Sequence, residues 1–111
     1  MPERLIVAGD FNANVIFRRD GTRRDFRTLA ERLENDVGLR SAYHTVTKEA
    51  YGRERQATHW FQWNARKPYH LDYSYAPSGW PILSVTVGSY QEWRPLSDHA
   101  PLIVDYSIRK R

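Results

Sequence analysis

Residues 69–76 read YHLDYSYA, and in this stretch large apolar or aromatic side chains alternate with polar ones. Successive side chains of a β-strand point to opposite faces of a sheet, so the alternation predicts a strand. One face carries the large residues Tyr69, Leu71, Tyr73 and Tyr75. The other face carries the polar residues His70, Asp72 and Ser74. The large residues are suited to a core, and the polar face is either exposed to solvent or part of a site.

Further segments are rich in β-branched and aromatic residues and are separated by glycine, proline or charged residues, which is typical of strands. They are RLIVA (4–8), SAYHTV (41–46), ATHWFQW (57–63), ILSVTVG (82–88) and PLIVDYSI (101–108). The first is a continuous apolar run, which favours a strand buried on both faces. Residues 48–55, KEAYGRER, are polar and are expected to form an exposed loop or a hairpin tip.

The segment after the first predicted strand has the pattern of one amphipathic helix. Its apolar residues recur at the spacing of a single helix face, and they are Phe26, Leu29, Ala30, Leu33 and Val37. Thr22 and Asp25 fit a capping box before this helix, and Gly38 fits the C′ position after it. A single helix among several strands predicts one small domain that spans residues 1–111.

Length and composition describe one globular domain without disulfides. The chain has 111 residues, of which 41% are hydrophobic and 14% aromatic, so it can bury a core and is not a disordered chain. It contains no cysteine, which excludes disulfide bridges and thiolate metal sites. It has neither an N-terminal signal pattern nor an apolar run near the roughly 18 residues that span a membrane. We therefore expect a cytoplasmic protein without a membrane span.

The net charge of +4 mildly favours polyanionic partners. Much of the positive charge lies just before the predicted helix or in its first turn, at Arg18, Arg19, Arg23, Arg24 and Arg27. This cluster is either a solvated loop or a patch that steers phosphate groups toward a site.

Residues 57–63 contain His59, Trp60, Phe61 and Trp63. Exposed rings could form a platform on which nucleic-acid bases stack. Such rings more often pack between a helix and a sheet or between two sheets, and this is the role that we expect here.

Polar side chains occur next to or within three of the predicted strands. Asp10 and Asn12 follow the strand at 4–8, Asp72 lies in the strand at 69–76, and Asp98 and His99 precede the strand at 101–108. Taken singly, such residues are common in turns, caps and salt bridges. If these strands are neighbours, however, the side chains converge at one edge of a sheet.

The converging set permits a specific chemistry. Carboxylates bind hard cations such as Mg²⁺ through oxygen, and such an ion stabilises charge that builds on a phosphoryl group. A histidine whose second nitrogen bonds a carboxylate has a fixed tautomer. Asparagine can donate a hydrogen bond to a phosphate oxygen. Together these residue types are suited to hydrolysis of a phosphoester by an activated water.

Four segments, in this order, resemble the endonuclease/exonuclease/phosphatase superfamily, which includes deoxyribonuclease I-like nucleases, abasic-site endonucleases, inositol polyphosphate phosphatases and neutral sphingomyelinases. They are LIVAGDFNAN (5–14), KPYHLDYSYAP (67–77), SVTVGSY (84–90) and LSDHAPLIVDY (96–106). The resemblance covers nearly the whole chain. It implies a two-sheet α/β sandwich with helices outside, and an active site at one edge of the sheets that is served by Mg²⁺ or Mn²⁺.

The resemblance also implies roles for the matching residues. Asp10 would orient or deprotonate the attacking water, or protonate the leaving group, and Asn12 would hold the scissile phosphate. His99 would contact the phosphate and pair with Asp72. Asp98 would belong to the metal site together with Asp10.

Further residues would contact the substrate. His70 stands where the family often has histidine or arginine, and it either touches the phosphate or packs. Strand parity places His70 on the same side as Asp72. Arg18 and Arg19 lie close to Asp10 in the sequence, which favours a nucleic acid or another polyphosphate as the substrate.

The chain departs from the family pattern at its start. The family's metal-binding glutamate, an asparagine and a catalytic tyrosine precede the GDFN motif, whereas only nine residues precede Asp10. The chain thus resembles the C-terminal half of the family domain. We expect an α+β fold with one mostly antiparallel sheet of about five to six strands and one main helix, or half of the four-layer sandwich. We also expect a weakly occupied, incomplete metal site and little or no activity from this chain alone.

Half of a sandwich leaves an apolar face uncovered, and such a face has to be buried in some way. We expect a homodimer in which a second copy replaces the missing sheet. Two alternatives to an enzyme remain open. One is a non-catalytic module that binds phosphate or nucleic acid or mediates dimerisation, and the other is a small α+β domain whose motifs are only turns and caps.

Overall fold

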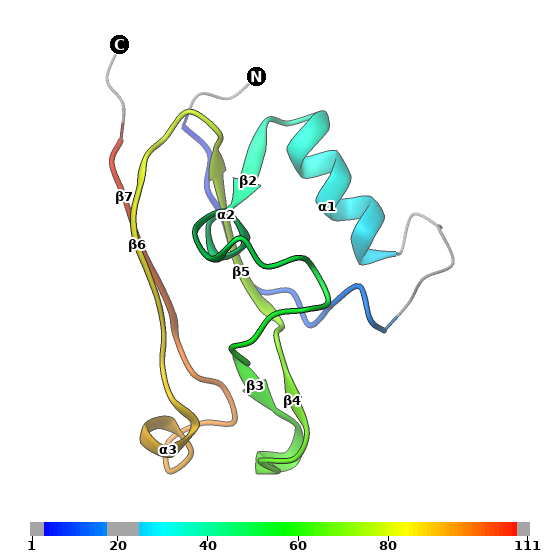
Figure 1. Cartoon of the computed structure of the whole chain (residues 1–111), viewed down its shortest axis with the longest axis vertical. Helices are drawn as coiled ribbons and strands as arrows, with labels where there is room; N and C mark the ends of the chain where they lie inside the picture. The colour runs from blue at the N-terminus through cyan, green and yellow to red at the C-terminus, as the bar shows by residue number, and fades with distance from the viewer. Residues whose placement is uncertain (1–3, 18–24, 109–111) are drawn as a thin grey trace.

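The computed structural model describes residues 4–17 and 25–108, which form an α+β fold (Figure 1). The strands are β1 (Val7–Asp10), β2 (Leu39–Ser41), β3 (His59–Trp60), β4 (Pro68–Tyr69), β5 (Asp72–Pro77), β6 (Ile82–Val87) and β7 (Leu102–Tyr106). The helices are α1 (Phe26–Asn35), α2 (Ala42–Thr47) and α3 (Tyr90–Trp93), with a 3₁₀ turn, η1, at Phe61–Trp63. None of the helices in the described part of the chain is both long and apolar enough to cross a membrane. The predicted α+β class is confirmed.

The described strands form three antiparallel sheets, in contrast to the predicted single sheet. Strand β5 is the centre of a three-stranded sheet with the order β1-β5-β2, while β3–β4 and β6–β7 are separate pairs. The predicted strand at 69–76 is interrupted between β4 and β5, where the backbone N–H groups of Leu71 and Asp72 both donate to the Thr58 hydroxyl. The prediction of one sheet was wrong. The Thr58 side chain separates β4 from β5, and β6 and β7 pair only with each other among the described strands.

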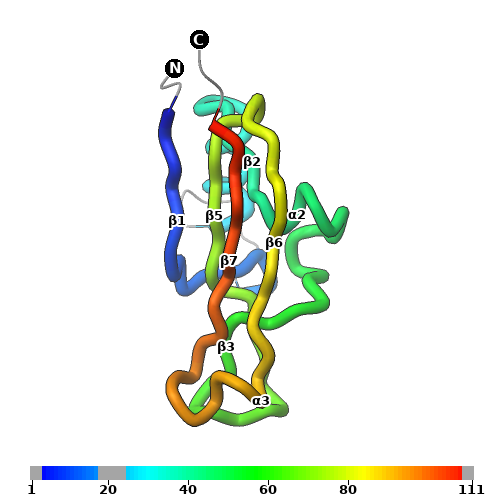
Figure 2. The backbone as a smooth tube through the Cα atoms, turned by 90° about the vertical axis from the view of Figure 1, so that its left-hand side faces the viewer, coloured from blue at the N-terminus to red at the C-terminus, as the bar shows by residue number. Residues whose placement is uncertain are grey.

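The β6–β7 hairpin forms a second layer beside the β1-β5-β2 sheet, and α1 lies on the other side of that sheet (Figures 1 and 2). The hydroxyls of Ser74 and Tyr106 are 2.7 Å apart and join β5 to β7. On its other face, β5 presents Tyr73 and Tyr75 to the core, where they are buried with Phe26 of α1. The predicted alternation is therefore confirmed within β5, which has one aromatic face and one polar face.

Helix α1 confirms the predicted amphipathic helix, except that Leu29 is exposed and Val37 lies beyond the end of the helix. Asp25 is its N-cap, and the Asp25 side chain accepts a hydrogen bond from the Arg27 backbone N–H. Thr22, the other member of the predicted capping box, lies outside the described residues. The C-cap is Asp36, and Gly38 follows with a left-handed backbone at φ 78°, one position later than predicted. Glycine adopts this conformation at little cost, so it lets the chain turn from α1 into β2.

The predicted strand at 41–46 is instead helix α2. Ser41 is the N-cap, and its side chain accepts a hydrogen bond from the His44 backbone N–H. The hydroxyls of Thr45 and Thr47 donate to carbonyl oxygens four residues earlier in the chain. Threonine is common in strands, but here its hydroxyl is satisfied within the helix and serine supplies a favourable cap. Composition predicted the wrong element because it ignores these local bonds.

Strand β1 is open to solvent, although its continuous apolar run predicted burial on both faces. Ala8, Gly9 and Asp10 are all exposed. Strand β1 pairs with β5 along one edge, and no strand in residues 4–17 or 25–108 pairs with its other edge. Leu5 and Val7 pack against the core, while Ile6 and Ala8 line the groove on the other side, so only one face of the run is covered by the core.

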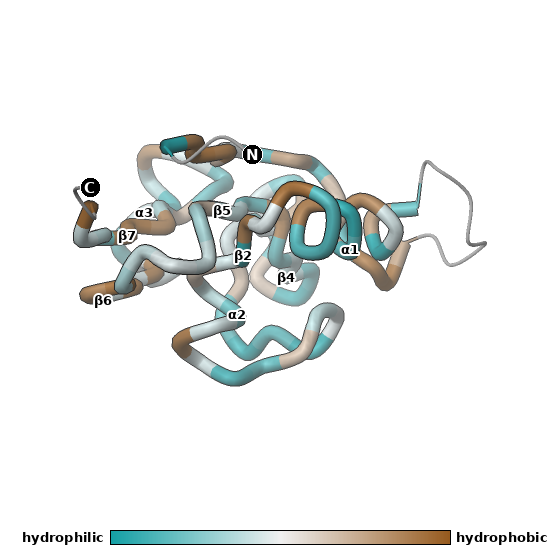
Figure 3. The backbone as a smooth tube through the Cα atoms, turned by 90° about the horizontal axis from the view of Figure 1, so that it is seen from above, coloured by the Kyte–Doolittle hydropathy of each residue, from teal (hydrophilic) through white to brown (hydrophobic). Residues whose placement is uncertain are grey.

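The β6–β7 hairpin also carries exposed apolar side chains. Leu83 on β6 is 67% exposed, and Ile103 on β7 and Ile6 before β1 are exposed as well. Figure 3 shows hydrophobic stretches of the hairpin at one edge of the molecule. Leu83 and Ile103 lie on the hairpin, and Ile6 lies just before β1, whose outer edge pairs with no strand among the described residues.

Candidate functional site

Three of the predicted site residues meet at one end of the β1-β5-β2 sheet. Asp10 and Asp72 are opposite one another in the β1–β5 pairing. His99, which precedes β7, has its Nδ1 atom 2.8 Å from Asp72 Oδ2 and its Nε2 atom 3.6 Å from Asp10 Oδ2. The structure therefore brings together side chains that are far apart in the sequence.

The contact with Asp72 fixes the tautomer of His99. An ionised carboxylate can only accept hydrogen bonds, so Nδ1 carries the ring proton and donates it to Asp72. The lone pair of Nε2 is then available, beside Asp10. The separation of 3.6 Å is too long for a direct hydrogen bond, so a water or a ligand atom next to this pair could contact both groups. An Asp–His pair in this state can accept a proton from water.

This cluster opens into a groove of about 750 Å³ between β1, β5 and the segment that leads into β7. Asp10, Asp72 and His99 supply its carboxylate and imidazole groups. Its apolar lining includes Ile6, Trp93, Leu102, Val104 and Tyr106. A few polar groups in a mainly apolar groove are typical of a ligand site.

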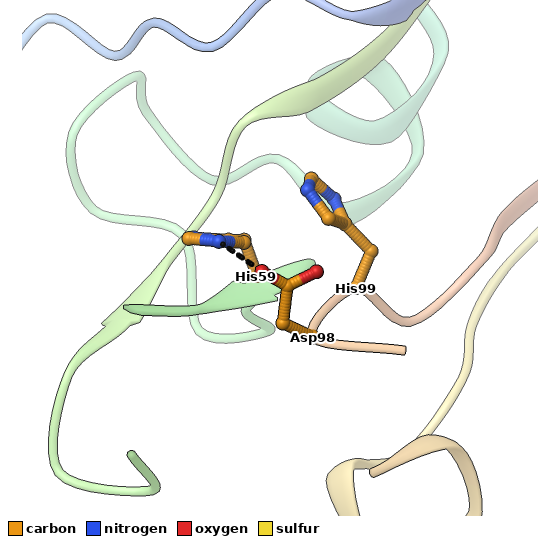
Figure 4. A group of neighbouring side chains, drawn as sticks. All are labelled: His59, Asp98 and His99. Atoms are coloured by element: carbon orange, nitrogen blue, oxygen red, sulfur yellow. Dashed lines mark hydrogen bonds and ion pairs between the residues drawn. The ribbon is translucent and has the colours of Figure 1, made fainter. Parts of the chain in front are cut away.

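His59 joins the site, although the sequence placed it among packing residues. His59 and His99 face each other in an isolated antiparallel bridge. His59 Nε2 lies 3.2 Å from Asp98 Oδ2, and the His59 and His99 ring centroids are 4.6 Å apart (Figure 4). A polar residue within an aromatic segment was the one sequence signal for this role. Its partner Asp98 comes 39 residues later, so spacing along the chain does not reveal the contact.

The two predicted metal ligands, Asp10 and Asp98, belong to different groups of potential ligands. Within the described residues, one group is Asp10, Asp72 and His99, and the other is His59, Asp98 and His99. Both groups include imidazole nitrogen, whereas Mg²⁺ prefers an octahedral set of oxygen ligands. The ligand atoms of both groups therefore suit the predicted Mg²⁺ poorly and suit transition metals better.

His70 packs in the interior. Its side chain is buried, its Nδ1 donates to the Gln56 carbonyl at 2.9 Å, and its ring centroid lies 4.5 Å from that of Tyr43. Burial lowers the pKa of His70 and so favours the neutral ring. The parity that placed His70 beside Asp72 does not hold, because the strand is interrupted between β4 and β5. Of the two roles expected for His70, the structure supports packing.

Asn12 lies at the rim of a second cavity. Its backbone N–H donates to Asp10 Oδ1 at 2.7 Å, in a turn where Asn12 has a left-handed backbone (φ 50°). The second cavity, of about 400 Å³, is lined by Asn12, Phe17, His59, Phe61, Lys67, Tyr69 and Leu71. The GDFN motif is thus locally a turn, and this turn carries Asn12 to the side of the cluster where His59 lies. Arg18 and Arg19 lie outside the described residues.

Known proteins give no independent identification of this site. No family model, no curated protein and no solved structure matches the chain. The resemblance to the endonuclease/exonuclease/phosphatase superfamily therefore rests on the sequence motifs alone, and the function follows as a proposal from these motifs and the side-chain arrangement.

Proposed function

We propose that the chain carries the C-terminal part of a metal-dependent phosphoester hydrolase site, at which an activated water attacks phosphorus. The observation that carries the proposal is the Asp72–His99 pair, whose available Nε2 atom lies beside Asp10 in an open groove. These three residues come from the GDFN, HLDY and SDH motifs. Motifs that were only turns and caps would not need to meet around one histidine.

Each residue has a distinct task in this mechanism. His99 Nε2 takes a proton from the attacking water, and the Asp72 carboxylate stabilises the imidazolium that results. Asp10 positions that water or protonates the leaving group, and Asn12 donates a hydrogen bond to the phosphate. A bound divalent ion would stabilise the negative charge on the phosphoryl oxygens.

The second cavity favours a substrate that contains a nucleobase. Phe61 is 45% exposed, and the Lys67 ammonium lies 5.5 Å from the centroid of its ring. Phe17 is also exposed and contacts Tyr69. Exposed rings next to positive charge are suited to a base and its phosphate, and the net charge of +4 acts in the same direction. Packing, the role expected for Phe61, does not account for its exposure.

Cleavage of a short single-stranded oligonucleotide tests the enzyme against a second candidate, a non-catalytic module that binds nucleic acid. Because the two predicted metal ligands, Asp10 and Asp98, fall in different groups of potential ligands, we expect slow cleavage by this chain. Addition of a fragment that supplies the first half of a family domain should accelerate it. The His99→Ala variant should lose cleavage both alone and with the added fragment. Salt-dependent binding without cleavage in either mixture would instead support the binding module.

We also propose that a second copy of the chain covers the unpaired edge of β1 and the exposed apolar residues of the hairpin. Exposed apolar side chains that gather on one surface often mark an interaction site, and Ile6, Leu83 and Ile103 are each exposed on β6, on β7 or just before β1. A second copy supplies the same apolar residues in return, as the interface of a two-fold dimer requires.

The Leu83→Glu variant should shift the chain from dimer to monomer, because it places a charge on the apolar surface. Sedimentation equilibrium at micromolar concentration measures the change. Leu29→Glu is the matched control, since Leu29 is exposed on α1, on the opposite side of the main sheet (Figure 1). A wild-type chain that stays monomeric at high micromolar concentration contradicts the dimer.

A further inference from the structure

We propose that His59, Asp98 and His99 bind a divalent transition metal such as Zn²⁺ or Co²⁺ in preference to Mg²⁺. One nitrogen of each ring and one oxygen of Asp98 lie within 4.8 Å of one another. Imidazole nitrogen is a preferred ligand of zinc-like ions, whereas Mg²⁺ prefers oxygen. A bound ion would occupy His99 Nε2, so metal binding and the proposed base role of that atom exclude each other at the same moment. Metal binding is measured without a substrate, so the two proposals are tested separately.

The backbone holds the two imidazoles on facing segments. Two backbone hydrogen bonds, of 2.8 Å and 2.9 Å, join residues 58–60 to residues 98–100. His59 and His99 are the opposed pair between these bonds. Directly opposed residues of an antiparallel pair project from the same face, and the two ring centroids are 4.6 Å apart. Two of the three ligands are therefore positioned by main-chain bonds before any ion arrives.

The surroundings of His99 and Asp98 suit metal ligands. The Nδ1 atom of His99 is bonded to Asp72, which is the arrangement in which a carboxylate orients a metal-bound histidine. Its Nε2 atom is left as the ligand, and Asp10 Oδ2 is 3.6 Å from that atom, so Asp10 is in reach of the same ion. Asp98 has one oxygen 3.2 Å from His59 Nε2, and Figure 4 shows its other oxygen turned toward the side of His99.

The other ring nitrogen of His59 argues against a merely structural role. His59 Nδ1 is buried and has no hydrogen-bond partner among the described residues. A buried polar atom without a partner costs free energy, so an apolar side chain would fill this position at a lower cost. An ion bound by the other nitrogen, Nε2, would account for a histidine at this position, although it would not supply Nδ1 with a partner.

Cobalt titration of the purified 111-residue chain tests the site. After treatment with EDTA, the chain should bind Co²⁺ with visible d–d absorption; Zn²⁺ should displace the Co²⁺, and excess Mg²⁺ should not. His59→Ala and Asp98→Asn should each weaken Co²⁺ binding at least about 100-fold, because loss of even an outer-shell partner costs roughly 10- to 100-fold. Asp36→Asn is the matched control: Asp36 is exposed at the end of α1, and its variant should bind Co²⁺ as the wild type does.

Circular dichroism shows whether each variant is folded, and the wild-type chain gives a second measurement that needs no variant. Zn²⁺ should raise its thermal unfolding midpoint, and Mg²⁺ at the same concentration should not. Wild-type Co²⁺ affinity in a folded His59→Ala variant, displacement of Co²⁺ by Mg²⁺, or no thermal shift with Zn²⁺ would each overturn the proposal. Weaker binding in Asp98→Asn but not in His59→Ala would also overturn it, because it would indicate a site made of oxygen ligands.

Discussion

Replacing Asp72 with asparagine should lower kcat for phosphoester hydrolysis by about 10³- to 10⁴-fold, with little change in KM. Asp72 Oδ2 accepts the Nδ1 proton of His99 and thereby keeps Nε2 available as a base. An asparagine can present its NH₂ group to Nδ1, which moves the ring proton to Nε2 and removes the base. The loss corresponds to about 4–5.5 kcal/mol of transition-state stabilisation, at about 1.4 kcal/mol for each factor of ten.

The rate is measured with the oligonucleotide substrate, either with the chain alone or with the added fragment of a family domain, whichever cleaves faster. Asp105→Asn is the matched control, because Asp105 is an exposed residue of β7 whose carboxylate accepts a hydrogen bond from the Ser84 hydroxyl. This control should keep the wild-type kcat, and Asp72→Glu should recover part of the lost rate. An Asp72→Asn protein with the wild-type kcat contradicts the role of Asp72, and so does an equal loss in Asp105→Asn.

Local periodicity predicted those parts of the fold that local geometry controls. Phe26 and Ala30 of α1 are buried as the helical spacing predicts. Tyr73 and Tyr75 face the core, while Ser74 faces the hairpin, as strand alternation predicts. The order of the motifs and the family resemblance, rather than periodicity, predicted that the acidic residues and His99 meet.

Contacts between distant residues control the features that the sequence did not predict. The Thr58 hydroxyl interrupts the strand at 69–76, and this break moves His70 into the interior. The pairing of residues 58–60 with residues 98–100 places His59 in the site. In neither case does the spacing of residues along the chain indicate which atoms become partners.

Glu54 is a third feature of this kind, and it lies in the segment predicted to be an exposed loop. Its side chain is only 3% exposed. Glu54 Oε2 lies 2.7 Å from His44 Nε2, and Oε1 accepts a hydrogen bond from Asn14 Nδ2 at 3.1 Å. The Gly52 backbone N–H also donates to this carboxylate, at 3.2 Å. A carboxylate is buried only when it has such partners, and two of them come from other parts of the chain.

Replacing Glu54 with alanine should destabilise the protein by about 3–5 kcal/mol. The change removes the acceptor for His44, Asn14 and Gly52 and leaves these donors buried without it. A domain has a total stability of only about 5–15 kcal/mol, so the variant should lose a large fraction of its resistance to urea. Unfolding in urea, followed by tryptophan fluorescence, measures the difference in the free energy of unfolding.

The dependence of stability on pH separates the charge of Glu54 from its bulk. Burial opposes ionisation of Glu54, but hydrogen bonds from His44 and Asn14 outweigh it and lower the pKa below the usual 4.5. A carboxyl with a lower pKa in the folded state stabilises the fold above its unfolded pKa, and this contribution disappears as the pH falls through the folded pKa. The stability of the wild type should therefore fall as the pH drops below about 4.5. Glu54→Gln keeps the volume but not the charge, so its stability should be lower at neutral pH and should fall less on acidification.

Glu31→Ala is the control, because Glu31 is exposed on α1 and its loss should change the free energy of unfolding by no more than about 0.5 kcal/mol. If Glu54→Ala unfolds at the same urea concentration as Glu31→Ala, the carboxylate is not holding residues 48–55 in place. If Glu54→Gln keeps the full acid dependence of the wild type, another carboxyl is responsible for it. Both results together would support the original prediction that residues 48–55 form an exposed loop.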